Sequence, residues 1–197
     1  MDIYLADRLA PLPTVNTKVS PKSYDALTGR YDLLGGILTI SRRGPHLFAQ
    51  FGGQPEAEIF PTSDTEFFSK AGAQITFVKD SSGQAVRLSV RTYDGNELNA
   101  LRVKDIAEAK VDPAVYDRLV GKYDYGNGAV LTVTREGNHV FAQLTGQRKF
   151  EIFPESETEY FWKVVDAQVT FVKDAAGKVT KAIHHQGGQT IDAPKIQ

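Results

Sequence analysis

Histidine is the residue type in this sequence best suited to acid–base or metal chemistry, and the chain contains 4 of them. His184 and His185 are adjacent, but neighbouring side chains on a strand point to opposite faces, so we do not expect their imidazoles to chelate one metal ion. His46 and His139 have no third ligand at a useful spacing. The sequence therefore predicts no metal site.

The groups that could act as nucleophiles lack the partners that would activate them. The chain has no cysteine, no G-x-S-x-G, S-x-x-K or H-E-x-x-H motif, no P-loop and no dinucleotide-binding glycine run. Glu58 and Glu151 could act as a general acid or base, but each lies in a predicted hairpin, where an exposed carboxylate is ordinary. We expect no catalytic residue and no cofactor; an enzyme with an uncharacterised His/carboxylate site is the weaker alternative.

Most of these residues lie in or near a stretch that occurs twice. It reads FAQFGGQPEAEIFP at 48–61 and FAQLTGQRKFEIFP at 141–154. Equivalent residues stay 92 to 94 positions apart, as Gly29 and Gly121 or Phe77 and Phe171 do. Roughly 35 of about 80 aligned positions are identical, which indicates an internal duplication. Two copies are too few for a solenoid, so the pattern predicts two duplicated domains.

Each copy has the pattern of a β-barrel. Hydrophobic residues alternate with period two between closely spaced turn signals. The strands expected in the first copy are 31–34, 37–42, 46–51, 56–60, 66–70, 74–79, 84–92 and 97–103. Ser20-Pro21 and Asp112-Pro113 are typical starts of a short helix before each copy. The predicted fold is all-β, with two tandem eight-stranded antiparallel up-and-down barrels, each preceded by a short helix.

The expected domain organisation follows from the two copies. It comprises an N-terminal linker or remnant at 1–19, a first repeat at 20–103, a linker at 104–111 and a second repeat at 112–197. Residues 1–19 are expected to form a short helical turn and a linker. Their apolar side chains either pack on the body of the protein or are left from contacts with an upstream domain.

Alternation assigns one apolar face of each predicted sheet to the barrel core. In the first copy this set is Leu38, Ile40, Leu47, Ala49, Phe51, Ala57, Ile59, Ile75, Phe77, Val86, Leu88 and Val90. In the second copy it is Leu131, Val133, Val140, Ala142, Leu144, Phe150, Ile152, Val169 and Phe171.

The opposite face of the repeated hairpin is less polar than a solvent face should be. A three-residue turn at 52–54 places Phe48 opposite Glu58. The resulting outer patch comprises His46, Phe48, Gln50, Glu58 and Phe60, and in the second copy His139, Phe141, Gln143, Glu151 and Phe153. Three interpretations are open: the patch packs internally, it docks another protein or domain, or the faces are inverted and it lines a ligand cavity.

Positions that differ between the copies are candidates for a function of one barrel alone. Leu33, Ser69 and Val90 correspond to Tyr125, Trp162 and His184, so the second barrel is expected to be more polar and aromatic inside. A barrel of about eight strands is either filled by side chains or holds one small ligand. The candidate ligand-binding residues are Tyr31, Phe68, Tyr125, Trp162 and His184.

Composition excludes several classes of partner. The formal net charge of the 197 residues is -1, without a basic stripe, so a nucleic acid is not expected as a partner. No apolar run approaches the ~20 residues that cross a bilayer, and residues 1–13 lack the pattern of a signal peptide. The sequence does not specify an oligomeric state.

The residues also resemble a known family. The pattern includes YDALTGRYDL, LTISRRGPHLFAQFGGQ, EIFPTSDTEFF and QITFVKDSSGQ, with YDRLVGKYDY, LTVTREGNHVFAQLTGQ, EIFPESETEYF and AQVTFVKDAAGK in the second copy. It resembles the domain of unknown function that is often appended to beta-lactamase-like serine hydrolases and other exported bacterial hydrolases. The resemblance implies a lipocalin-like barrel, an accessory role beside a catalytic domain, and a periplasmic or secreted location. The tandem arrangement departs from the usual single copy.

The expected function is therefore that of a non-catalytic accessory or binding module. In one hypothesis the tandem barrels bind a small apolar ligand. In the other they dock on a serine hydrolase or an envelope protein, which they regulate or position.

Overall fold

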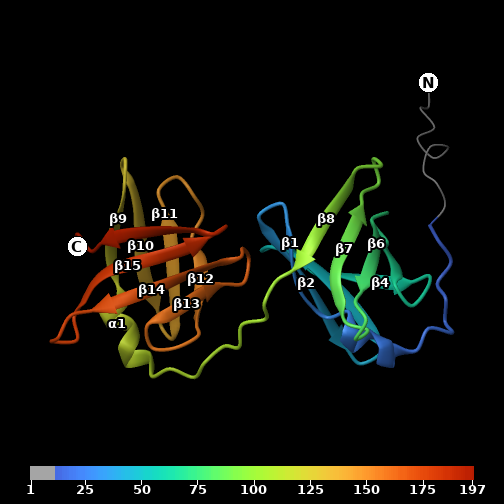
Figure 1. The fold of residues 1–197 in the computed structure, drawn as a ribbon, viewed down its shortest axis with the longest axis horizontal. Coiled ribbons are helices and arrows are strands. Elements are labelled where there is room, and N and C mark those ends of the chain that lie inside the picture. Colours follow the sequence, from blue (N-terminus) through green and yellow to red (C-terminus); the bar gives the residue numbers. More distant parts are fainter. Residues whose placement is uncertain (1–11) are drawn as a thin grey trace. The chain divides into compact units, whose positions relative to one another are not determined.

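The computed structural model describes residues 12–197 and is built almost entirely of β-strands (Figure 1). Contacts divide the chain into two compact units, which correspond to the two repeats. We call the sheet of the first unit barrel 1 and that of the second barrel 2. Residues 1–11, which include much of the helical turn expected within 1–19, lie outside the described residues. No helix in the described part is long and apolar enough to cross a membrane.

Barrel 1 is a closed antiparallel meander. The 3-10 helix η2 (Pro21–Ala26) precedes it. Its strands are β1 (Gly29–Leu33), β2 (Gly36–Arg43), β3 (His46–Phe51), β4 (Ala57–Pro61), β5 (Glu66–Ser69), β6 (Gln74–Lys79), β7 (Ala85–Arg91) and β8 (Glu97–Arg102). Each strand pairs with the next in sequence, and β8 pairs with β1 to close the sheet. This confirms the predicted up-and-down topology.

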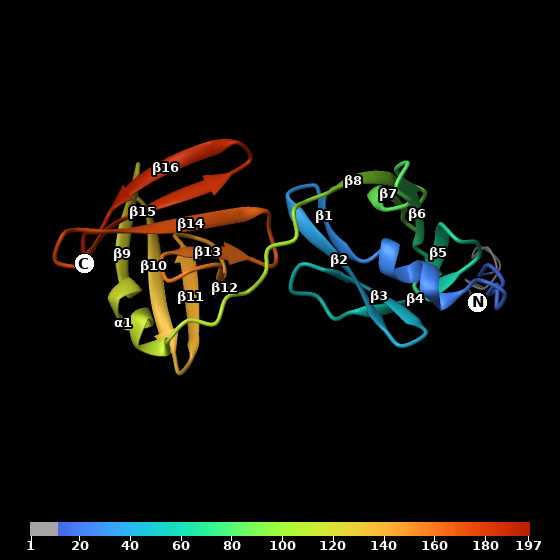
Figure 2. The same cartoon turned by 60° about the horizontal axis from the view of Figure 1, so that its bottom comes forward.

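Barrel 2 has the same strand order after η3 (Pro113–Val115) and α1 (Tyr116–Leu119), but an isolated bridge between Tyr123 and Lys195 takes the place of the ladder that closes barrel 1. Its strands are β9 (Gly121–Gly126), β10 (Ala129–Glu136), β11 (His139–Leu144), β12 (Phe150–Pro154), β13 (Glu159–Trp162), β14 (Ala167–Lys173), β15 (Val179–Gln186) and β16 (Gln189–Pro194). The chain after β16 returns to β9 (Figure 1, Figure 2). There the amide of Lys122 donates to the carbonyl of Gln197 at 2.9 Å, and Ile196 donates to Lys122 at 2.8 Å.

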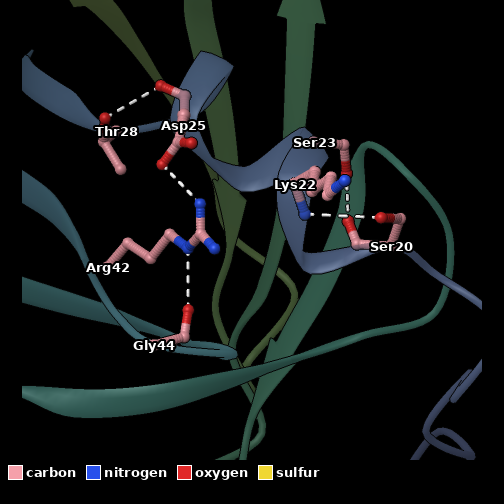
Figure 3. A network of polar contacts seen from close by, with 7 residues as sticks. All are labelled: Ser20, Lys22, Ser23, Asp25, Thr28, Arg42 and Gly44. Carbon is pink, nitrogen blue, oxygen red and sulfur yellow. Dashed lines mark hydrogen bonds and ion pairs between the residues drawn. The ribbon is translucent and has the colours of Figure 1, made fainter.

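In each unit, an arginine of the barrel forms an ion pair with the short helical segment that precedes it, which we call the lead-in helix. Ser20 caps η2 by accepting from the amide of Lys22, as the Ser-Pro pattern predicts. Arg42 on β2 forms an ion pair with Asp25 of η2 at 2.7 Å and donates through Nε to the carbonyl of Gly44 at 2.7 Å (Figure 3). The second unit has the same distances between Arg135, Asp117 and Gly137. Because both aspartate side chains are largely exposed, we expect each ion pair to contribute only about 0–1 kcal/mol.

Aromatic rings in edge-on or tilted contact fill the helix end of each barrel. In barrel 1 Phe67 contacts both Tyr24 and Phe77 edge-on, with centroids 5.5 and 5.7 Å away, and Tyr31 meets Phe77 at 6.1 Å. The hydroxyl of Tyr31 donates to the carbonyl of Leu27 at 2.8 Å. Barrel 2 repeats this layer with Tyr116, Tyr160, Phe171 and Tyr123, whose hydroxyl donates to Leu119 at 2.6 Å. This layer recurs in both barrels, so we assign it to the fold.

The predicted core face is correct for most positions, and the inverted assignment of faces is wrong, because the aliphatic residues form the buried clusters. Three residues in barrel 1 differ. Val86 is exposed because the pairing of β6 with β7 skips it: Val78 pairs with Arg87 and Lys79 with Ala85, which makes Val86 the extra residue of a bulge. Phe51 and Ala57 are exposed because they lie at the end of the β3–β4 hairpin.

The segment before each lead-in helix also pairs with its barrel. The amide of Asn16 donates to the carbonyl of Pro61 at 2.7 Å, and that of Ala109 donates to Pro154 at 2.8 Å. These contacts are equivalent in the two units. In each unit, one residue of a segment that we predicted to be a linker therefore pairs with the barrel. The domain limits at 20 and 112 remain predictions.

Candidate functional site

In the first unit the outer patch lies on the face of the β3–β4 hairpin that points away from the core. In the second unit it lies on the equivalent face of the β11–β12 hairpin. The predicted pairing of Phe48 with Glu58 is correct. Nδ1 of His46 lies 2.5 Å from Oε1 of Glu58, and the same atoms of His139 and Glu151 are also 2.5 Å apart. The His46 side chain is 56% exposed and that of Glu58 34%, so water surrounds this pair.

The other side chains of the outer patch have local partners in both copies. Arg43 lies over the ring of Phe48 at 3.9 Å, and Lys149 over that of Phe141 at 4.7 Å. The amides of Gln50 and Gln143 donate to the carbonyls of Gln54 and Gln147 at 2.9 and 3.0 Å and so hold the hairpin turns. Phe60 and Phe153 pack on Phe68 and Phe161, with centroids 5.7 and 6.0 Å apart. These contacts give the recurring residues a structural role.

Phe68 does not line the barrel interior, contrary to our expectation for this candidate ligand-binding residue. It pairs directly with Phe60 and therefore shares the outward face, whereas Ser69 and Ile59 share the inward one. The adjacent Phe67 occupies the core instead. Tyr31 does point inward, but it is fully buried in the aromatic layer and its hydroxyl is bonded, so it serves the core.

A shallow groove of about 230 Å³ adjoins the outer patch of barrel 1. It lies between the segment before η2 and the β3–β4 hairpin, and His46, Glu58 and Phe60 line it. A His–carboxylate pair beside a groove is the geometry that a hydrolytic site would require. The hydroxyls in the lining belong to Thr17 and Tyr24, and burial raises the pKa of Tyr24, which makes its phenolate harder to form. The structure thus supplies a candidate base without an activated nucleophile.

Tyr125, Trp162 and His184 come together inside barrel 2, and we call them the inner cluster. They reach the interior from β9, β13 and β15. The ring centroid of His184 lies 5.3 Å from that of Trp162, in an edge-on arrangement, and 5.7 Å from that of Tyr125. His184 faces inward because it pairs with Val169, which is fully buried. Of the five candidate ligand-binding residues, these three lie close together.

Burial determines the protonation of the inner cluster. It lowers the pKa of His184, so the imidazole is neutral at pH 7, and it raises the pKa of Tyr125, so the phenol keeps its proton. Nε2 of His184 lies 3.2 Å from Oε1 of Gln186. Nδ1 of His184 and the hydroxyl of Tyr125 are buried and have no hydrogen-bond partner in the part of the chain that the structure covers.

Two further residues of barrel 2 were not among the predicted site residues. Gln186 fixes the orientation of His184, but nothing in the sequence marks it. Tyr160 is fully buried and its hydroxyl has no partner among the described residues. Comparison of the two copies could have identified it, because Phe67 occupies the equivalent position. Within residues 12–197 no group of three or more His, Cys, Asp and Glu side chains could hold a metal ion.

Comparison with known proteins identifies related sequences for both units. A family model described as a domain of unknown function (DUF3471) matches residues 13–102 and again residues 107–193. Penicillin-binding protein 4* of Bacillus subtilis (strain 168) is 35% identical over 77 residues, which cover 38% of this chain and 17% of that protein. The matched segment is therefore a small part of that relative.

Proposed function

Because the chain belongs to the family described as a domain of unknown function (DUF3471), here in two tandem copies, we propose that it is a non-catalytic accessory module that binds a small, largely apolar molecule in barrel 2. The observation that carries this proposal is the inner cluster. Three large side chains from three separate strands meet there, and two of their buried polar atoms have no hydrogen-bond partner within residues 12–197. Ligand sites are commonly apolar, with a few convergent polar groups of this kind.

Barrel 1 provides the internal comparison. It has the same topology and the same aromatic layer, but Leu33, Ser69 and Val90 occupy the positions of the inner cluster. Leu33 and Val90 are buried in its core, and the hydroxyl of Ser69 accepts from the amide of Ala73. The fold therefore forms without an imidazole, a phenol or an indole at these positions. Their presence in barrel 2 is best accounted for by a function.

The single tryptophan of the chain provides the assay, because Trp162 is part of the inner cluster. We expect the neutral apolar probe N-phenyl-1-naphthylamine to quench Trp162 fluorescence saturably. The control is the double variant Tyr125→Leu/His184→Val, which gives barrel 2 two side chains of barrel 1. Circular dichroism checks that it folds. Absence of saturable quenching in the wild-type chain, or equal quenching in both proteins, would contradict ligand binding at this site.

A second candidate function is docking on a hydrolase of the penicillin-binding-protein type, in the cell envelope. The observations that favour it are the partly exposed outer patches, the groove beside one of them, and the relative in which the matched segment accompanies a much longer chain. A sensor-chip measurement with immobilised penicillin-binding protein 4* tests it. Phe48→Ser and Phe141→Ser should weaken binding without loss of folding, whereas an unaltered sensor response would exclude the outer patches as the docking surface.

A further inference from the structure

The inner cluster contains a donor and an acceptor that remain to be paired. Nε2 of His184 lies 3.2 Å from the amide oxygen of Gln186, an arrangement that favours the tautomer with the proton on Nε2 and a lone pair on Nδ1. The hydroxyl of Tyr125 keeps its proton and can donate as well as accept. Both atoms are buried and unpartnered among the residues that the structure describes. The site therefore presents one obligatory acceptor beside one donor.

Leaving these two atoms unpaired costs the folded state free energy, because each has lost its hydrogen bonds to water. The equivalent residues of barrel 1, Leu33 and Val90, avoid that cost with apolar side chains in the same fold. Buried polar atoms that are not needed by a fold call for another partner, such as a bound molecule. The aromatic rings of Trp162 and Tyr125 both lie next to the imidazole, with centroids 5.3 and 5.7 Å away, and supply apolar surface beside it.

From this arrangement we propose that the ligand of barrel 2 carries a neutral group that both donates and accepts a hydrogen bond, such as the hydroxyl of a phenol or alcohol, on a flat apolar body. The ligand hydroxyl donates to Nδ1 of His184 and accepts from the hydroxyl of Tyr125. A carboxylate has no proton to give to Nδ1, and its charge would be desolvated beside a lone pair. An ether accepts from Tyr125 but leaves Nδ1 unpaired. This inference rests on the proposed function and adds the chemical class of the ligand.

Three small molecules of similar shape separate these cases: 4-propylphenol, 4-propylanisole and 4-propylbenzoate. The titrations use the full chain, and quenching of Trp162 reports binding. We expect the phenol to bind at least about tenfold more tightly than the ether, which is the effect of one well-placed hydrogen bond, and the benzoate to bind most weakly. His184→Val should remove most of the phenol's advantage, because a valine side chain cannot accept a hydrogen bond. The affinity for the ether should stay within about threefold of the wild-type value, because valine fits the equivalent position in barrel 1.

Tyr125→Phe is a second variant that keeps the ring and removes only the hydroxyl, and it should also reduce the preference for the phenol. Equal affinities for phenol and ether, or tightest binding of the benzoate, would overturn the proposed ligand class while leaving a ligand site in place. If N-phenyl-1-naphthylamine binds and none of the three compounds does, the class is likewise wrong. If nothing binds, the proposed function itself fails.

Discussion

Two tyrosines of barrel 2 should respond with opposite sign to the same substitution. Tyr123 and Tyr160 are both fully buried in one aromatic layer, but the hydroxyl of Tyr123 donates to Leu119 at 2.6 Å, whereas that of Tyr160 has no partner among the described residues. Tyr160→Phe removes an unsatisfied group and recreates Phe67 of barrel 1. We expect it to raise the free energy of unfolding by about 1 kcal/mol. Tyr123→Phe leaves the carbonyl of Leu119 unsatisfied and should lower the free energy of unfolding by about 1–3 kcal/mol.

Urea unfolding followed by Trp162 fluorescence measures both changes, because the single tryptophan reports on barrel 2 even if the two units unfold separately. Tyr31→Phe in barrel 1 is the control, since it breaks an equivalent bond without affecting the barrel that Trp162 reports on. If Tyr160→Phe destabilises barrel 2 as much as Tyr123→Phe does, then a buried water or another group satisfies the hydroxyl, and our account of this layer is wrong.

Three further measurements test other parts of the account. Asp112→Ala removes the side chain that caps η3 and should cost about 1 kcal/mol in urea unfolding, whereas no change would mean that the cap is dispensable. Arg135→Ala breaks the ion pair with Asp117, whose side chain is largely exposed, and should cost less than about 1 kcal/mol; a larger loss would mean that Arg135 stabilises the barrel chiefly through other contacts. Burial lowers the pKa of His184 in the folded state. The contribution of the neutral imidazole to folding stability is therefore present above the ordinary imidazole pKa of about 6.5 and is lost as the pH falls through the lowered pKa. Acidification should therefore reduce the unfolding midpoint of the wild-type chain more than that of His184→Val, and parallel curves would contradict this.

The fold was predictable because its signals are local and repeated. Period-two alternation and frequent turn residues specify short antiparallel strands, and the duplication provides two independent views of the same pattern. The inner cluster was predictable for a related reason: Tyr125, Trp162 and His184 differ in type from their counterparts, while most of the surrounding residues remain apolar. Comparison of the two copies thus served as an internal control.

The positions that were wrong have separate physical causes. Alternation identifies a face only while the register is regular, and the bulge between β6 and β7 shifts Val86 out of the core without any mark in the sequence. Phe67 and Phe68 are adjacent and identical, so alternation cannot decide which one faces inward. The contacts of the outer patch could not be predicted from the sequence either. The cation over Phe48 is Arg43 at the end of β2, whereas the cation over Phe141 is Lys149, just before β12.

Amide chemical shifts recorded during titration with N-phenyl-1-naphthylamine locate the bound probe. We expect the amides that shift to lie on β9, β13 and β15, around Tyr125, Trp162 and His184, and we expect no shifts on these strands in Tyr125→Leu/His184→Val. Shifts confined to the groove beside His46 and Glu58, shifts spread over barrel 1, or no shifts at all would contradict a ligand site inside barrel 2.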